Sequence, residues 1–223
     1  MNIMESIIRD ASLARVGAQK IEWVRKHMPV LGSIAEQYQK EQPLKGKKAV
    51  VCVHLEAKTA YLAEVMHQAG AEVYAVGSNP LSTQDDVCAG LAQSGVTVFA
   101  THGCTAEEYN SYQCKALSVL PDVIIDDGGD MMTLLHEQHP EWAVNLAGGC
   151  EETTTGIIRI RNRAKAGQLR FPMFNINDAD SSTFLTTVTA PAKACGTASC
   201  APPTWSYLAL RRWWWATAGA ARA

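Results

Sequence analysis

The chain has 223 residues, 47% of them apolar and 19% charged, and its 20 Lys and Arg residues against 22 Asp and Glu residues give a formal net charge of −2. Such a composition is that of a globular protein of one large or two small domains, and it argues against a binder of nucleic acids or membrane surfaces that works through a basic face. No apolar run approaches the roughly 20 residues that span a bilayer. The N-terminus lacks the pattern of a secretory signal, and the seven cysteines include no Cys-x-x-Cys pair. We therefore expect a cytoplasmic protein without a zinc site or a disulfide framework.

Two helices are predicted at the start of the chain. Apolar residues recur at steps of three and four from Ile7 to Met28, which is typical of an amphipathic helix. Pro29 should end this helix because proline cannot continue the hydrogen-bond ladder. A second, short helix fits residues 30–40.

Strands and helices alternate over the next hundred residues. Short apolar runs predict strands at 48–54, 72–76, 96–100 and 123–125, and the stretches between and after them predict helices at 58–69, 83–94, 105–116 and 131–138. Such alternation indicates βαβ units in a doubly wound, Rossmann-like parallel sheet of the α/β class. Ligands of such sheets bind beyond the carboxyl ends of the strands, so polar residues that directly follow a strand are candidates for function.

Several of these polar residues also have ordinary structural explanations. His54 could be a structural histidine at a strand end, Ser82 or Thr83 could be an N-cap, and Thr153–Thr155 could cap and start a helix.

The segment Asp126–Asp130 is harder to explain in this way. Its three carboxylates lie within five residues and repel one another, and its two glycines let the backbone approach a ligand closely. The residues alone leave open a hard metal ion bound by Asp126, Asp127 and Asp130, a hydroxyl-rich ligand, or proton transfer.

Four strings in this order and spacing resemble the S-adenosyl-L-homocysteine hydrolase (adenosylhomocysteinase) family. They are Ser-Thr-Gln-Asp at 82–85, Ile-Asp-Asp-Gly-Gly-Asp at 125–130, Glu-Glu-Thr-Thr-Thr-Gly at 151–156 and Asn-x-Asn-Asp at 175–178. The resemblance covers residues 10–180. It implies the reversible hydrolysis of S-adenosylhomocysteine to adenosine and homocysteine, in which a tightly held NAD oxidises the ribose 3′-hydroxyl and acidifies the C4′ proton. It also implies a substrate domain, a separate Rossmann domain for NAD, and a homo-tetramer.

The resemblance assigns roles to individual residues. His54 and Asp127 match the pair that transfers protons near the 4′ and 5′ positions, and Glu152 matches the carboxylate that binds the ribose hydroxyls. Thr153, Thr154 and Thr155 match the threonines that contact NAD. The chemistry of the residues agrees, because a carboxylate accepts two sugar hydroxyls well and histidine carries protons near neutral pH.

The segment near the adenine departs from the commonest form of the family. Glu56 stands where many members have Thr, and Lys58 stands where many have Glu, although this version resembles a prokaryotic branch. With Thr59, these two residues complete the expected substrate-binding set.

The resemblance stops near residue 180. All 22 acidic residues precede Ser181, whereas four of the six tryptophans follow it. The family continues with a Lys and, four residues later, an Asp-Asn pair, but the matching positions here are Ser182, Thr186 and Thr187.

The genetic code offers an explanation for this change. Deleting one C from GAC TCC AAG TAC CTT TTT GAC AAC yields codons for the residues found from Asp180 onward. In the other frame, residues 216–223 can encode Gly-Tyr-Gly-Trp-Cys-Gly-Lys-Gly, a glycine-rich NAD loop. We therefore expect an incomplete substrate domain at 1–180, a poorly packed out-of-frame tail at 181–223, and no NAD domain.

Three functional hypotheses follow, in descending order. The chain is an inactive fragment of an adenosylhomocysteinase, a non-catalytic adenosine-binding or subunit-interaction fragment, or a metal-dependent enzyme that uses the three aspartates.

Overall fold

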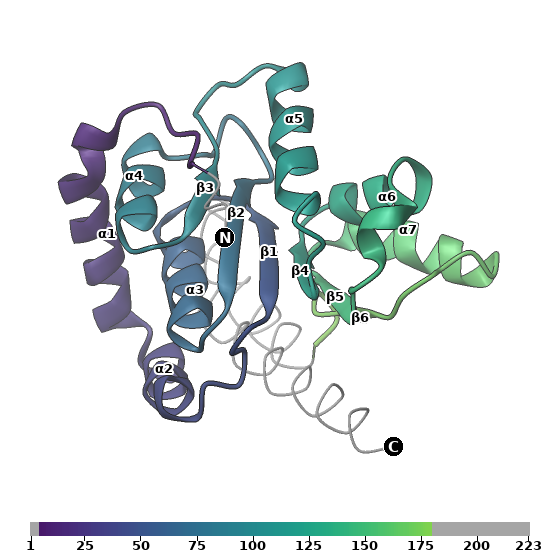
Figure 1. Cartoon of the computed structure of the whole chain (residues 1–223), viewed down its shortest axis with the longest axis horizontal. Coiled ribbons are helices and arrows are strands. Elements are labelled where there is room, and N and C mark those ends of the chain that lie inside the picture. The colour runs from purple at the N-terminus through teal and green to yellow at the C-terminus, as the bar shows by residue number, and fades with distance from the viewer. Residues whose placement is uncertain (1–4, 180–223) are drawn as a thin grey trace, which may run out of the picture.

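The protein, a computed structural model, is described for residues 5–179, which form a parallel sheet with helices on both faces (Figure 1). The predictions for residues 181–223 lie outside the described residues. The strands are β1 (Lys48–Val53), β2 (Glu72–Gly77), β3 (Thr97–Phe99), β4 (Val123–Asp126), β5 (Gly148–Glu151) and β6 (Met173–Asn175), in the spatial order β3-β2-β1-β4-β5-β6. Every adjacent pair is parallel, which confirms the doubly wound α/β fold.

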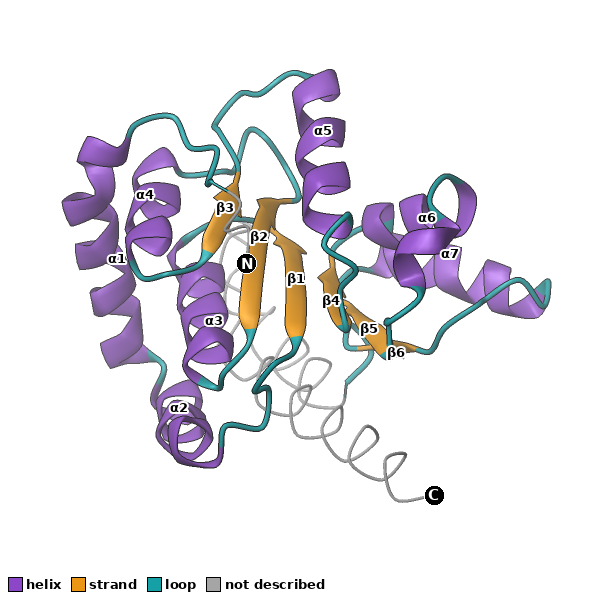
Figure 2. Ribbon diagram, in the orientation of Figure 1, coloured by secondary structure: helices purple, strands orange, loops and turns teal. Residues whose placement is uncertain are grey.

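The helices fall close to the predicted ranges (Figure 2). They are α1 (Ala14–His27), α2 (Pro29–Glu41), α3 (Ala57–Gln68), α4 (Asp85–Gln93), α5 (Ala106–Leu117), α6 (Asp130–Glu137) and α7 (Thr154–Lys165), with short 3-10 turns at Ala11–Leu13 and Pro140–Ala143. Within residues 5–179, no helix is long and apolar enough to cross a membrane.

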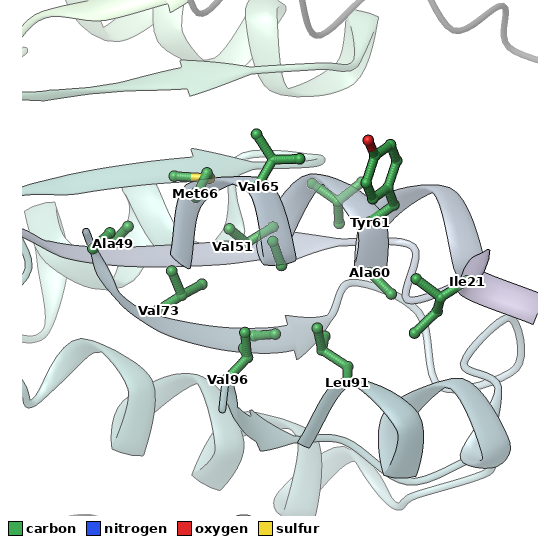
Figure 3. Packing of buried hydrophobic residues seen from close by; sticks show 14 of the residues in the cluster. Ile21, Ala49, Val51, Ala60, Tyr61, Val65, Met66, Val73, Leu91 and Val96 are labelled. Atoms are coloured by element: carbon green, nitrogen blue, oxygen red, sulfur yellow. The ribbon is translucent and has the colours of Figure 1, made fainter. Parts of the chain in front are cut away.

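Each face of the sheet has its own apolar core because successive strand residues point to opposite faces. Ala49, Val51 and Val53 of β1 belong to the cluster that also includes residues of α1–α4, whereas Val50 and Cys52 belong to the cluster with residues of α5–α7. Figure 3 shows part of the first cluster, to which Ile21 of α1, Tyr61 of α3 and Leu91 of α4 belong together with the strand residues Ala49, Val51 and Val73.

The first helix starts later than its apolar pattern predicts. Ile7 forms a parallel bridge with Phe99 of β3, and the backbone N–H of Ile7 donates to the carbonyl of Val98 at 2.7 Å. Asp10 then caps the 3-10 turn by accepting from the backbone N–H of Ser12 at 2.8 Å. The prediction of a helix from Ile7 was therefore wrong, because pairing with the sheet satisfies this backbone instead.

Strand β5 is not among the strands that the sequence predicted. Its sequence, Gly-Gly-Cys-Glu, has no β-branched residue. A Cβ atom on Gly149 would lie 2.5 Å from Cγ1 of Ile124 and 2.7 Å from Sδ of Met173. Side chains of the neighbouring strands fill this space, so glycine is required here for packing.

Candidate functional site

The candidate site lies at the carboxyl ends of β1 and β4, where the strand order reverses direction. The chain runs from β1 toward β2 and β3 on one side, and from β4 toward β5 and β6 on the other. Cys52 of β1 is in register with Asp126 of β4, so the residues that follow these strands emerge side by side. Such a switch point is the usual position of a ligand in an open parallel sheet.

His54 and Asp127 meet at this point. His54 follows β1 and has a half-exposed side chain, and Asp127 follows β4 and is only 7% exposed. Nε2 of His54 lies 3.5 Å from Oδ2 of Asp127, and the hydroxyl of Ser78 donates to the same oxygen at 2.7 Å. Gly128 and Gly129 follow with φ angles of 94° and 78°, the left-handed region that favours glycine, and the chain turns there into α6.

Ser82 orients the other side of the imidazole. Its hydroxyl oxygen lies 2.5 Å from Nδ1 of His54, and its O–H group donates to the carbonyl of Asn79 at 3.1 Å. Because that hydroxyl proton points to Asn79, the oxygen can accept a hydrogen bond from Nδ1–H of a neutral imidazole. Nε2 is then the ring nitrogen that faces Asp127, so a proton taken up from a substrate could pass between ring and carboxylate.

Ser78 and Ser82 are site residues that the sequence analysis did not assign. The predicted capping role of Ser82 or Thr83 was wrong, because the N-cap of α4 is Gln84 and the Thr83 hydroxyl donates to the carbonyl of Asn79. The signal was present in the position of both serines after β2, which neighbours β1 in the sheet.

Glu152 lies close to the same group of charges. Burial and the negative charge of Asp127 raise the pKa of Glu152 to about 7, and the positive charge of Lys58 opposes this shift. The free site therefore holds a carboxyl group that exchanges its proton near neutral pH.

The segment that begins α3 provides an ion pair and a support. Nζ of Lys58 lies 2.8 Å from Oε1 of Glu56, and both side chains are one-third exposed. The hydroxyl of Thr59 instead donates to the backbone carbonyl of His54 at 2.7 Å, and Thr59 is buried. Through this hydrogen bond, Thr59 holds the backbone that follows β1 in place.

The three aspartates of the 126–130 segment do not converge. Asp126 is fully buried and accepts from backbone N–H groups, and Asp130 accepts from Nη1 of Arg159 at 2.9 Å. Among residues 5–179, no group of three or more His, Cys, Asp or Glu side chains is arranged to hold a metal ion. The described residues therefore give no support to the metal hypothesis.

The threonines at the start of α7 divide into two kinds. Thr153 is the N-cap, since its hydroxyl oxygen accepts from the backbone N–H of Gly156 at 3.3 Å. Thr154 and Thr155 are exposed in the first turn. The structural explanation of Thr153 as a helix cap is thus confirmed, and the hydroxyls of Thr154 and Thr155 lie at the surface, where they can face a ligand.

Comparison with known proteins identifies the family. A sequence model of S-adenosyl-L-homocysteine hydrolase matches residues 5–145 and 136–184. The chain belongs to this family.

Individual members of the S-adenosyl-L-homocysteine hydrolase family are closely similar in sequence. The S-inosyl-L-homocysteine hydrolase of Methanocaldococcus jannaschii is 49% identical over 172 residues, which are 77% of this chain and 41% of that protein. The S-inosyl-L-homocysteine hydrolase of Methanococcus maripaludis is 48% identical over 174 residues, which are 78% and 42% of the two chains. The adenosylhomocysteinase of Aquifex aeolicus is 47% identical over 177 residues, 79% and 42%. The chain therefore spans about two fifths of the length of these relatives.

The strings by which the sequence resembles the hydrolase family surround one site. Ser82 begins the first string, Asp127 lies in the second and Glu152 in the third, and all three follow strands at one edge of the sheet. The fourth string reaches the third through Asn177, whose side-chain oxygen accepts from the hydroxyl of Thr154 at 3.4 Å. The segments that define the family in sequence are therefore neighbours in space.

Proposed function

We propose that this chain carries the nucleoside-binding side of a hydrolase that reversibly cleaves the thioether of an S-nucleosyl-homocysteine, releasing a nucleoside and homocysteine. The observation that carries this proposal is the His54–Asp127 pair beside the carboxyl group of Glu152. A carboxylate binds two adjacent ribose hydroxyls, and the imidazole–carboxylate pair can take up and return a proton at the sugar. The family membership supports the same reaction.

The residues of this chain would divide the chemistry among them. Glu152 would accept hydrogen bonds from the ribose 2′- and 3′-hydroxyls and hold the ring in place. Asp127, buried and bonded to Ser78 through Oδ2, would exchange a proton of the substrate with Nε2 of His54, which faces the same oxygen. Ser82 would keep the imidazole in the orientation that leaves Nε2 able to exchange that proton.

NAD is the cofactor that the family implies, and the described residues fit one edge of it. Thr154 and Thr155 present exposed hydroxyls and first-turn N–H groups at the start of α7, which can donate to a polar ligand. The printed sequence contains no Gly-x-Gly, so a pyrophosphate cradle of the Rossmann kind would come from elsewhere. When bound, NAD supplies the oxidising power at the ribose 3′ position.

Four further proposals accompany this function. We propose that residues 181–223 are translated out of frame, which is supported by the end of the family match at residue 184. We propose that the chain as it stands does not turn over substrate. The homo-tetramer and the cytoplasmic location remain proposals of the same kind.

Nucleoside binding tests the proposed site directly. We expect the chain to bind a purine nucleoside in isothermal titration calorimetry and Glu152→Gln to weaken the affinity about 10- to 100-fold, because hydrogen bonds to a charged group contribute about 1.5–3 kcal/mol. Since the pKa of Glu152 is raised to about 7, its carboxylate is lost as the pH falls below 7. The affinity of the wild type should therefore fall with decreasing pH by up to about tenfold per pH unit, and that of Glu152→Gln should not.

The matched control is Glu107→Gln, which changes an exposed glutamate of α5 in the same way. Equal affinities and equal pH profiles for wild type and Glu152→Gln would contradict the assigned role.

The Glu56–Lys58 pair favours a second candidate, in which the base is hypoxanthine and the substrate is S-inosylhomocysteine. An ammonium group only donates hydrogen bonds, so Lys58 suits the O6 acceptor of hypoxanthine and not the amino group of adenine. A carboxylate such as Glu56 can accept from N1–H, which hypoxanthine has and adenine lacks. Two of the similar proteins named above are S-inosyl-L-homocysteine hydrolases.

Base preference is measured by comparing the Kd of inosine and adenosine. We expect inosine to bind about 10- to 100-fold more tightly, since one charged hydrogen bond distinguishes the bases. Lys58→Met should remove most of this difference, and Lys45→Met, at an exposed position, should leave it unchanged. Tighter binding of adenosine by the wild type would exclude the inosine assignment.

A further inference from the structure

Two carboxyl groups lie buried directly beneath the proposed site. Asp126 is the last residue of β4, Glu151 is the last residue of β5, and the two are partners in the strand register. Registered residues of parallel strands point to the same face of the sheet, so these side chains are neighbours. Both residues are 0% exposed.

Asp126 fixes the backbone on both sides of the loop that carries Asp127. Its Oδ1 accepts from the backbone N–H of Asp127 at 3.0 Å, and its Oδ2 accepts from the backbone N–H of Met132 at 2.9 Å. The first bond sets the direction in which Asp127 leaves β4, and the second holds the first turn of α6.

Glu151 connects the same loop to the start of α7. Its Oε1 accepts from the backbone N–H of Gly128 at 2.8 Å, the backbone N–H of Thr153 at 2.9 Å and the Thr153 hydroxyl at 2.7 Å. Gly128 follows Asp127, and Thr153 follows Glu152. One buried oxygen therefore ties together the two segments that carry the proposed proton carrier and the proposed ribose ligand.

The second oxygen of Glu151 has no such partner. Oε2 is buried without a hydrogen bond, and a Cβ atom on Gly156 would lie 2.1 Å from the carboxyl carbon, so the adjoining helix packs against this group. A buried, unsolvated carboxylate oxygen is costly, and protonation removes the charge. Burial accordingly raises the pKa of Glu151, against the hydrogen bonds from Thr153 and Gly128.

No cation relieves the two carboxyl groups within residues 5–179, since neither forms an ion pair there with Lys, Arg or His. The titratable groups that face them are Cys52 of β1, Tyr109 of α5, Asp127 and Glu152. Burial raises the pKa of Cys52 and of Tyr109, so both stay neutral near pH 7. Burial and the charge of Glu151 together raise the pKa of Asp126 to about 8.

We propose that Asp126 and Glu151 share one proton and act as positioning residues, which hold Asp127 and Glu152 at the geometry that the site requires. The positioning half of this inference rests on the proposed function, and the shared proton does not. Because two like charges on neighbouring buried groups cannot both be tolerated, the shared proton keeps the pair singly charged while every acceptor bond to the backbone is retained.

Carboxyl ¹³C NMR between pH 4 and pH 9 tests the shared proton. The signals are assigned from their loss in Asp126→Asn and Glu151→Gln. In the wild type we expect one proton to remain on the pair at pH 7. In Glu151→Gln, which removes the neighbouring charge, the Asp126 midpoint should fall by at least one pH unit. Ionisation of both groups at or below pH 7, or an unmoved Asp126 midpoint, would overturn the proposal.

Nucleoside affinity tests the positioning role. Glu151→Ala removes all three acceptor bonds and should weaken inosine and adenosine binding at least tenfold, whereas Glu151→Gln keeps an acceptor oxygen and should recover most of that loss. The Glu107→Gln control should behave as wild type. If Glu151→Ala binds as tightly as wild type, or Glu151→Gln as weakly as Glu151→Ala, the positioning role is wrong. If the wild type binds neither nucleoside, the proposed function fails, and the carboxyl titration still decides whether the proton is shared.

Discussion

Inserting one base after codon 180 is expected to turn the chain, which we propose to be inactive, into a working hydrolase, provided that the gene continues in the restored frame. The insertion should place a Lys near position 182, an Asp-Asn pair near 186–187 and a glycine-rich loop near 216–223. Holding a cofactor and a substrate in reactive orientation contributes on the order of 7–11 kcal/mol to such reactions, so the gain in rate should span several orders of magnitude. The measurement is hydrolysis of S-adenosyl- and S-inosylhomocysteine with added NAD, before and after the insertion.

A three-base insertion at the same codon is the matched control. It lengthens the chain by one residue and leaves the frame unchanged, so it should restore neither the Lys nor activity. Turnover by the original chain above a no-protein background would contradict its assignment as an inactive fragment, and would equally contradict the non-catalytic binding hypothesis. If the restored frame encodes an unrelated sequence, the frameshift explanation is wrong, and Ser182 is a natural difference from the family.

The strands and helices that could be predicted are those in which the pattern of apolar residues matches the burial of the same residues. The apolar, β-branched run at Ala49–Val53 predicts a buried strand because every side chain there meets a core. Gly148–Glu151 carries no such pattern, since the side chains of Ile124 and Met173 supply the packing. The helix predicted from Ile7 was wrong because the apolar side chain of Ile7 fits a helical pattern, whereas its backbone pairs with β3. In both cases the deciding contacts come from distant parts of the chain.

The candidate site was predictable as a group of residues but not in its division of roles. The sequence shows Asp126 and Asp127 as adjacent carboxylates, and the resemblance selects Asp127. Only the strand geometry explains the difference, because Asp126 is still within β4 and points into the core, whereas Asp127 lies beyond it and meets His54. The same holds for Glu151 and Glu152. Alternation along a strand separates two neighbours of identical chemistry into a buried support and a residue of the site.

Replacing Asp127 by Asn in the frame-restored protein is expected to lower kcat by about 10²- to 10⁴-fold, the range that general acid–base groups contribute. Asparagine keeps the shape of the side chain, and its oxygen can still accept from the hydroxyl of Ser78, which bonds to Asp127 at 2.7 Å. It cannot take up a proton opposite Nε2 of His54. The nucleoside Kd should therefore change much less than kcat.

Glu152→Gln provides the contrast, because the proposed role of Glu152 is to bind the ribose. Its loss should appear first in the nucleoside Kd, since a neutral amide accepts hydroxyl hydrogen bonds more weakly than a carboxylate. Both variants are compared with Glu107→Gln through kcat for hydrolysis and Kd for inosine and adenosine. Full kcat in Asp127→Asn would refute proton transfer by this residue. A rise in Kd with kcat unchanged would instead assign Asp127 to binding, because an interaction lost equally in the ground and transition states leaves the chemical step unchanged.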